Sequence, residues 1–429
     1  MSLSRQRLVA TLVALLSCAL TGFAVLVMQV RAEGVNELSR TLPPSTWIAL
    51  PPLPKQGPSA IFALSVNPFN NQVVIAGRSD GALMRSTDGG ITWKVVRSGG
   101  SSVLTVAFSP AKGGIVLAGL RGTGALVSKD GGLSWAVVSG LDSRSVRVFG
   151  FALTLVVAGT DHGVYASADG LTWRAAGLES TSIGALTVAA IHDPVRLIAG
   201  SDAVASTGGV PLYLSTDGGT SWRQIKAAIS GKVVASLTAG PLPPARTIRP
   251  LVVGTDAGLF ISIDNGASFT PSSGGALLPS TDYTQIAFVT THFDRFYAAS
   301  DGGGSRSGGL WRTRDAAHHF TTLAPPGPSV TALAVSNDEI PILYVATFRP
   351  SDQVAALWAY RDTGGTPQGL PATPTPATSG TRTNPPPLAG TSWIGQLLSS
   401  GRTPYIAVGV VALIVILMAV VSHFRGRRG

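Results

Sequence analysis

The chain has 429 residues, of which 45% are hydrophobic and only 13% are charged, and it contains 51 glycines and 29 prolines. Its formal net charge is +10, but residues 41–365 hold 23 lysines and arginines against 20 aspartates and glutamates, so most of the excess lies in the tails. The central region therefore offers no basic stripe of the kind that nucleic-acid binding requires, and we expect no nucleic-acid partner.

The first element is an apolar run of 23 residues without a charge, residues 8–30, which follows a basic tail at residues 1–7. A run of this length can cross a bilayer as a helix, so we interpret it as a transmembrane signal anchor. A cleaved signal peptide is the alternative, with Val30-Arg31-Ala32 as the candidate cleavage site. The one cysteine, Cys18, lies inside this run in a poor lipidation context, so we expect no disulfide in the rest of the chain.

After a linker at residues 31–45, residues 46–363 contain six copies of one pattern, spaced 39 to 51 residues apart. They read STDGGITW from Ser86, SKDGGLSW from Ser128, SADGLTW from Ser167, STDGGTSW from Ser215, SIDNGASF from Ser262 and TRDAAHHF from Thr313. Aspartate accepts hydrogen bonds from its own turn, glycine supplies a positive φ, and tryptophan opens the next strand with a large apolar body. The pattern resembles the Asp-box (BNR) repeat, which that family places in the blades of β-propellers.

Each copy follows the same lead-in of two β-rich runs, such as VVIAG and then ALMRS, which predicts the order strand, turn, strand, box, strand. A seventh lead-in, PILYVAT and then ALWAYRDTGG, puts Asp362 at the box position but lacks the strand after the box. The segment Trp47-Ile48-Ala49-Leu50 resembles that missing strand, so we expect it to pair with residues 355–360 and close the ring.

The fold that we expect is all-β: a seven-bladed β-propeller of four-stranded antiparallel blades, closed by an N-terminal strand and flanked by terminal transmembrane helices. The resemblance implies that the box aspartates form turns and bind no ligand. These structural aspartates are Asp88, Asp130, Asp169, Asp217, Asp264 and Asp315.

In such a ring the boxes lie between the third and fourth strands of each blade, and propellers of this kind usually bind their ligands on the opposite face. The loops expected on that face differ in length, which is typical of a binding surface; they include SDAVASTGGVP, SDGGGSRSGG and FRPSDQVAA. The candidate binding residues are Arg78, Arg121, His162, Arg306 and Arg349. The recurring aspartates of these loops are interpreted as turn formers: Asp80, Asp161, Asp202, Asp256 and Asp301.

Sialidases share Asp boxes, and this resemblance raises the alternative of a glycoside hydrolase, either sialidase-like or like the Asp-box glucanases. A sialidase needs an arginine cluster, a tyrosine nucleophile tuned by a glutamate, and an acidic proton donor. Here residues 46–363 hold only two glutamates, Glu179 and Glu339, and Tyr283 is the one tyrosine placed to act with Glu179. We therefore expect no catalytic residues, no cofactor and no metal site, and the six histidines are scattered.

The chain ends in a Thr/Pro-rich stalk at residues 364–391, an interfacial segment at residues 392–403, an apolar helix at residues 404–424 and a basic tail at residues 425–429. Both apolar runs carry arginines on their outer flanks, which predicts cytoplasmic termini and an extracytoplasmic propeller at the cell membrane. Because both tethers join the ring on the side of the boxes, we expect that side to look toward the membrane.

The box spacing, the lead-in and the count of seven also resemble the photosystem II stability/assembly factor family, whose propellers hold membrane-protein intermediates. Sortilin-type receptors are a more distant likeness, since their disulfide-rich module has no counterpart here. The hypothesis from the sequence is a membrane-tethered binding or assembly scaffold without enzymatic activity, whose partner is an unidentified protein on the loop face.

Overall fold

The computed structural model describes residues 42–54, 59–190, 195–203, 209–226, 228–244, 246–278, 281–302 and 308–365. The two apolar runs, the stalk beyond residue 365, the interfacial segment and both basic tails lie outside these residues. In the part that is described, no helix has the length and apolar character to cross a bilayer.

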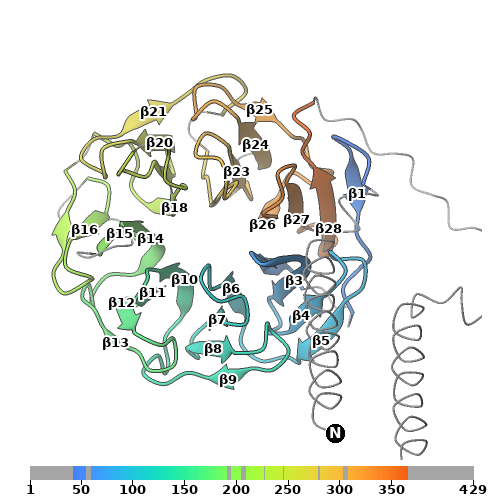
Figure 1. Cartoon of the computed structure of the whole chain (residues 1–429), viewed down its shortest axis with the longest axis horizontal. Helices are drawn as coiled ribbons and strands as arrows, with labels where there is room; N and C mark the ends of the chain where they lie inside the picture. The colour runs from blue at the N-terminus through green and yellow to red at the C-terminus, as the bar shows by residue number, and fades with distance from the viewer. Residues whose placement is uncertain are drawn as a thin grey trace, which may run out of the picture. The chain divides into compact units, whose positions relative to one another are not determined.

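The described residues form seven antiparallel sheets of four strands each, arranged as blades around a ring (Figure 1). This arrangement confirms the predicted seven-bladed all-β propeller. The innermost strands are β2 (Ile61–Asn67), β6 (Val103–Phe108), β10 (Val146–Phe151), β14 (Ile183–Ala190), β18 (Val234–Ala239), β22 (Gln285–Phe288) and β26 (Val330–Val335). The second strands are β3 (Asn70–Arg78), β7 (Val116–Leu120), β11 (Val156–Thr160), β15 (Arg196–Ser201), β19 (Leu251–Thr255), β23 (Phe296–Ser300) and β27 (Ile342–Arg349).

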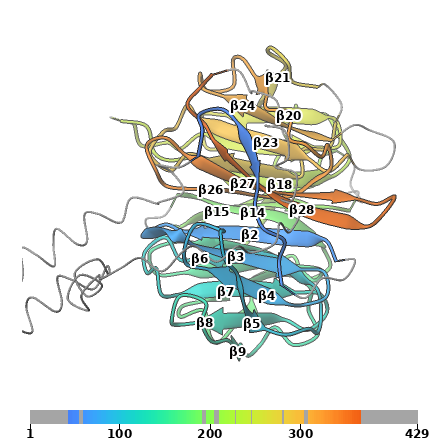
Figure 2. The same cartoon turned by 90° about the vertical axis from the view of Figure 1, so that its right-hand side faces the viewer.

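The third strands are β4 (Leu83–Ser86), β8 (Ala125–Ser128), β12 (Gly163–Ser167), β16 (Leu212–Ser215), β20 (Gly258–Ser262), β24 (Gly309–Thr313) and β28 (Val354–Arg361). The outer strands are β5 (Lys94–Arg97), β9 (Ala136–Val137), β13 (Arg174–Ala175), β17 (Arg223–Gln224), β21 (Thr270–Ser272), β25 (Thr321–Thr322) and β1 (Trp47–Ala49). The seventh blade thus takes its outer strand, β1, from the N-terminal side, and Figure 2 views the ring from where this blade meets the first.

A glycine near the end of the second strand lets neighbouring blades approach closely. A Cβ added to Gly77 would lie 2.4 Å from a methyl of Val103, and one added to Gly254 would lie 2.3 Å from the carbonyl oxygen of Tyr283. In both cases the contacted residue belongs to the start of the next blade, at or just before its innermost strand. The recurring Ala-Gly and Gly-Thr pairs of the lead-in therefore mark the places where one blade packs on the next.

The six Asp boxes share one hydrogen-bonded turn, which the first box illustrates. The hydroxyl of Ser86 donates to Asp88 Oδ1 at 2.7 Å and accepts from the amide of Gly90 at 2.8 Å. Asp88 also accepts from the amide of Thr92 at 2.8 Å and from its hydroxyl at 2.5 Å. Gly89 and Gly90 have φ of 72° and 92°, which favours glycine at both positions. The box is therefore a local turn that satisfies its own backbone.

The sixth box keeps this geometry although its sequence is degenerate. Asp315 accepts from the hydroxyl of Thr313 at 2.9 Å and from the amide of His319 at 2.9 Å. The Nδ1 atom of His319 lies 2.7 Å from Asp315 Oδ2, where the first, second, fourth and fifth boxes place a serine or threonine hydroxyl. His319 is thus a turn residue in this box.

The hydrogen bonds of the boxes also hold their carboxyl groups ionised. At Asp217 the hydroxyl and the amide of Ser221 lower the pKa to about 2. A group whose pKa is depressed in the folded state stabilises the fold at pH values above its unfolded pKa, near 4, and this contribution disappears as the pH falls through about 2. The boxes therefore favour the folded state throughout the neutral range.

We expect Asp88→Ala to lower the free energy of unfolding by about 1–3 kcal/mol, because the amide of Thr92 and the hydroxyl of Ser86 lose their acceptor. Partner binding should be unchanged, since the box lies away from the loops that carry the candidate site. Chemical denaturation of both proteins measures the difference. Asp142→Ala, which changes an exposed aspartate outside the boxes, is the control, and an equal effect of the two variants would contradict the interpretation.

The seventh box position has a different role from the other six. Asp362 is 1% exposed, accepts from Tyr297 Oη at 2.6 Å and forms an ion pair with Arg312 at 2.5 Å. Arg312 and Tyr297 belong to β24 and β23 of the sixth blade. The carboxylate at the end of β28 therefore joins the last two blades through a buried charge pair.

Candidate functional site

The two faces of the ring differ in their loops. We call "box face" the side that carries the Asp boxes and the turns from first to second strands, and "loop face" the opposite side. The loop face carries the turns from second to third strands and the loops that enter the next blade. Four of the predicted binding residues lie on the loop face: Arg78, Arg121, His162 and Arg349. The fifth, Arg306, lies outside the described residues.

Three of the recurring loop-face aspartates bind backbone amides. Asp80 accepts from the amide of Ala82 at 3.1 Å, Asp161 from Ser145 at 2.9 Å and Asp256 from Lys232 at 2.6 Å. In the last two cases the turn between the second and third strands is tied to the loop that enters the same blade. These carboxylates therefore shape the loop face.

A cavity of about 420 Å³ opens on the loop face where several innermost strands begin. Its lining includes Arg121, Arg147 and Asp301, and we call it the channel mouth; the other lining residues are Phe62, Leu104, Ser145 and Thr284. Arg147 also forms an ion pair with Asp202. Burial lowers the pKa of Arg147 and Arg121 adds to this effect, whereas Asp161 opposes it. The channel mouth therefore holds two arginines close enough to repel each other.

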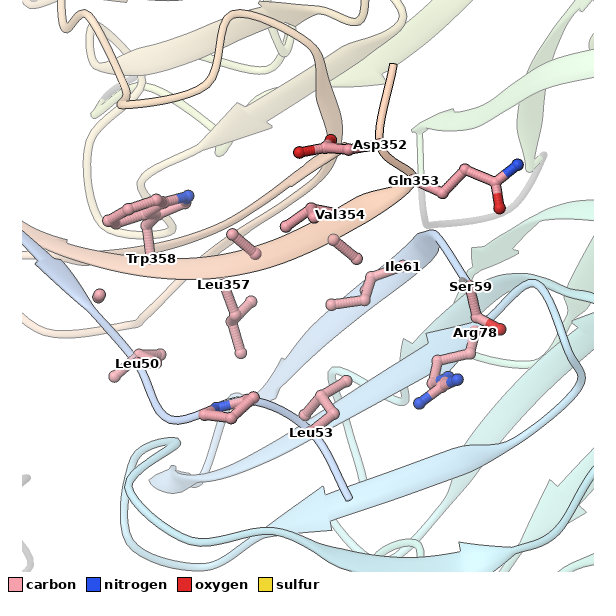
Figure 3. A pocket seen from close by; sticks show the side chains of 14 residues that line it. Leu50, Leu53, Ser59, Ile61, Arg78, Asp352, Gln353, Val354, Leu357 and Trp358 are labelled. Atoms are coloured by element: carbon pink, nitrogen blue, oxygen red, sulfur yellow. The ribbon is translucent and has the colours of Figure 1, made fainter. Parts of the chain in front are cut away.

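A second cavity, of about 530 Å³, lies between the seventh and first blades, and we call it the junction groove (Figure 3). One wall is the first half of β28, from Val354 to Leu357, and the opposite wall is formed by the chain between β1 and β2 together with Ile61. The lining residues are Ala49, Leu50, Pro52, Leu53, Ser59, Ile61, Arg78, Asp352, Gln353, Val354, Ala355, Ala356, Leu357 and Trp358. Most of this lining is apolar.

Two of the predicted binding residues stand at this groove. Arg78 is only 3% exposed; it pairs with Asp80 at 2.8 Å, and its Nη1 donates to the carbonyl of Pro54 at 3.3 Å. Arg349 is exposed and pairs with Asp352, at 2.8 Å from Nε to Oδ1, so it positions a carboxylate of the groove rim. Arg78 therefore holds the chain that forms one wall at Pro54, and Arg349 holds the carboxylate of Asp352 at the rim.

The outer edge of β28 is covered by another strand over only part of its length. β1 pairs with Trp358, Ala359 and Tyr360, and one further hydrogen bond joins the amide of Leu50 to the carbonyl of Leu357 at 2.9 Å. The same register would next place Pro52 opposite Ala355, but proline has no amide hydrogen to donate. The chain leaves the sheet here.

Because backbone groups alternate between the two edges of a strand, and Leu357 faces β1, the amide and carbonyl of Ala355 also face outward. They point toward the junction groove, while β27 pairs with β28 along its whole length on the other side. Among the described residues no strand pairs with β28 at this point, so the groove contains a short free strand edge.

The residues of the hydrolase alternative do not meet in one site. Glu179 is exposed in the loop between the third and fourth blades, whereas Tyr283 precedes β22 of the sixth blade. Tyr283 is fully buried and donates to the carbonyl of Leu278 at 2.7 Å, and burial raises the pKa of its hydroxyl well above the ordinary value. Its ring packs edge-on against Trp311, with centroids 5.3 Å apart. The hydroxyl is placed as a structural donor.

The other predicted residues occupy separate parts of the loop face. His162 is 58% exposed at its side chain and lies 3.3 Å from Asp161, and Arg121 lines the channel mouth. The sequence analysis missed Arg147, whose one signal is a lone charge within the apolar strand VRVFGF. It also missed the junction groove, which opens where Pro51 and Pro52 turn the chain away from β28. Among the described residues, no group of three or more histidines, cysteines or acidic residues is placed to hold a metal ion.

Comparisons with known proteins agree with this fold. The family model described as BNR/Asp-box repeat matches residues 84–95, which span the first box. A search of the curated proteins finds no sequence match. Among solved structures, U3-55K has a TM-score of 0.55 and 13% identity, covering 73% of this chain and 98% of its own.

Two YCF48 structures are also similar. The one described as YCF48 bound to D1 peptide has a TM-score of 0.50 and 17% identity, and the match covers 73% of this chain and 96% of that one. YCF48 from Cyanidioschyzon merolae has a TM-score of 0.49 and 14% identity, with 74% and 98% covered. At these identities the likeness concerns the fold. The chain is a seven-bladed β-propeller that carries the BNR/Asp-box repeat.

Proposed function

We propose that the protein is a membrane-tethered, extracytoplasmic scaffold without enzymatic activity, which binds an extended segment of a partner protein in the junction groove. The single observation that carries this proposal is the free edge of β28 at Ala355, beside an apolar groove of about 530 Å³. An extended peptide can add a strand to such an edge: backbone hydrogen bonds supply affinity and side-chain pockets supply selectivity.

The shape of the groove suits a short extended segment. Pro51 and Pro52 turn the chain away from β28, and the apolar side chains of Leu53, Ile61 and Leu357 line the space that opens. In a peptide that continues the sheet, every second side chain would point toward this apolar lining. We therefore expect the bound segment to carry apolar residues at alternate positions.

A catalytic function has less support from the two loop-face cavities. Glycoside hydrolysis generally uses a pair of carboxyl groups that flank the bond to be cleaved. Among the described residues, the junction groove is lined by one carboxylate, Asp352, and the channel mouth by one, Asp301. Asp352 is engaged by Arg349.

The membrane tether rests on the sequence: residues 8–30 and 404–424 are apolar runs with arginines on their outer flanks. The YCF48 structure that contains a D1 peptide provides an example of a propeller of this fold with a bound peptide. Together these observations favour a scaffold that holds part of another protein close to a membrane.

The proposal is tested by photo-cross-linking of the full chain in its native membrane, with a benzophenone amino acid at Val354. This residue is 45% exposed and lines the groove. We expect a discrete cross-linked product that disappears in Ala355→Pro, because proline removes the free amide of the strand edge but no hydrogen bond to β27. Thermal unfolding of Ala355→Pro should match that of the unaltered protein.

Two controls make the result specific. Ala355→Ser keeps the backbone amide and should retain the product. The same photoreactive residue at Leu278, which is 41% exposed on the loop face outside the groove, should give no product sensitive to Ala355→Pro. A product from Val354 that persists in a folded Ala355→Pro protein would show that no strand is added at this edge.

A further inference from the structure

The exposed apolar side chains of the propeller are concentrated on one face. In the described part of the chain, eight of the eleven large apolar residues that are exposed lie on the box face. Five belong to turns between first and second strands: Phe69, Leu153, Leu242, Phe293 and Ile340. Three belong to Asp boxes: Ile91, Leu133 and Ile263. They come from six of the seven blades, so the apolar tips are spread around the ring.

The exposure of these tips is high for side chains of their type. Leu153 is 64% exposed, Phe69 62% and Ile263 68%. Ile263 and Phe293 also line a cavity of about 500 Å³ between the fifth and sixth blades, together with three prolines of the turn before β19. Large apolar side chains gathered on one exposed face of a folded protein mark a site of protein–protein or membrane contact.

The ends of the propeller chain emerge on the same face. The segment before β1 and the segment after β28 are joined by a hydrogen bond of 2.9 Å between the hydroxyls of Ser45 and Thr363. From Leu42 back to the apolar run that ends at residue 30 there are few residues, which can extend over roughly 40 Å at most. The chain outside the described residues therefore leads from the box face to an apolar run that is long enough to enter a bilayer.

We propose that the box face rests on the lipid bilayer, with its apolar tips inserted among the lipid headgroups and the first acyl carbons. The inference rests on the membrane tether of the proposed function, and it assigns a second surface, distinct from the junction groove, to contact with lipid. Amphipathic surfaces bind membranes at this depth through their buried apolar area.

The charges of the box face define the kind of bilayer that fits. The six box carboxylates lie on this side, as do exposed cations such as Lys112, Lys129, Arg246 and Arg314. Acidic and basic groups are thus mixed, and the face is not a cationic surface selective for anionic lipids. Contact with the bilayer depends on apolar insertion, so it forms on zwitterionic phosphatidylcholine and changes little with salt.

The test uses the full chain reconstituted into phosphatidylcholine vesicles, with Cys18 replaced by alanine and a polarity-sensitive fluorophore attached to single cysteines. The box-face variants are Leu153→Cys and Ile263→Cys, and the matched loop-face variants are Leu278→Cys and Val354→Cys. A lipid that carries a nitroxide high in its acyl chain should quench the box-face labels at least twofold more strongly than the loop-face labels. Aqueous iodide should show the reverse order.

Each outcome has a defined meaning. Equal quenching of the two pairs by the nitroxide lipid, or stronger quenching of the loop-face pair, in protein that floats with the vesicles overturns the lipid contact and leaves the tether intact. Protein that does not float overturns the tether and this inference together. Cross-linking from Val354 is independent of both, so the junction groove stands or falls by its own test. In 0.5 M salt the Debye length is roughly 4 Å, so interactions between exposed charges are strongly screened. A fall of the quenching difference by more than half under this condition would contradict apolar insertion.

Discussion

Trp47→Ala is expected to lower the free energy of unfolding by about 3–5 kcal/mol, the largest effect of any single apolar truncation in the ring. Trp47 is 2% exposed in β1, and its indole packs on Tyr360 with centroids 4.8 Å apart. Its Nε1 donates to the carbonyl of Leu323 at 2.7 Å, so one side chain links β1 both to β28 and to the sixth blade. Removing it should open the ring where the two ends of the propeller meet.

Urea unfolding measures this effect, and hydrogen exchange locates it. Trp135→Ala is the matched control, because Trp135 is the half-buried tryptophan of the second box, away from the closure. We expect Trp47→Ala to be clearly the more destabilising variant and to speed exchange in β28 and β26. If both variants lost equal stability and exchange in β28 stayed unchanged, closure of the ring by β1 would be contradicted.

Asp362→Asn is expected to destabilise the protein by about 3–5 kcal/mol. The side chains of Asp362 and Arg312 are 0% and 5% exposed, so loss of the carboxylate charge leaves a guanidinium buried without its counter-ion. Tyr297, whose hydroxyl donates to the same carboxylate, would lose a charged acceptor as well. The loss of stability arises mainly from the buried guanidinium charge of Arg312, which is left unpaired.

The double variant Arg312→Met with Asp362→Leu separates this explanation from a simple packing defect. Replacing a buried pair by apolar groups of similar size is often close to neutral, so the double variant should recover most of the stability that Asp362→Asn loses. Denaturation curves of the three proteins give the comparison. A double variant that is even less stable than Asp362→Asn would show that the pair acts through its shape rather than through its charge.

The repeat made the ring predictable because its chemistry is local. Ser86, Asp88 and Gly90 lie within five residues, and their hydrogen bonds depend on little beyond that span. Six such turns at a four-strand period therefore indicated the blades. The role of Asp362 could not be predicted from local sequence. Its partners Arg312 and Tyr297 are 50 and 65 residues away and belong to another blade.

The candidate site was predictable as a face but not as a cavity. Unequal loops pointed to the loop face, and Arg78, Arg121 and Arg349 do line or border its cavities. The junction groove depends on where β1 ends relative to β28, and this is set by the register between two segments more than 300 residues apart in the sequence. Arg147 was not predicted because it lies in an innermost strand. The sequence pattern of that strand does not show that the side chain lines the channel mouth.

The central claim, that β28 offers a free strand edge to a partner, is tested most directly by amide exchange at Ala355. In the isolated protein this amide should exchange much faster than that of Ala356, which faces β27. In the complex purified from the membrane through a tag on this chain, exchange at Ala355 should slow to the rate of Ala356. An Ala355 amide that is already as protected as Ala356 in the isolated protein, or one that stays fast in the complex, would contradict the account.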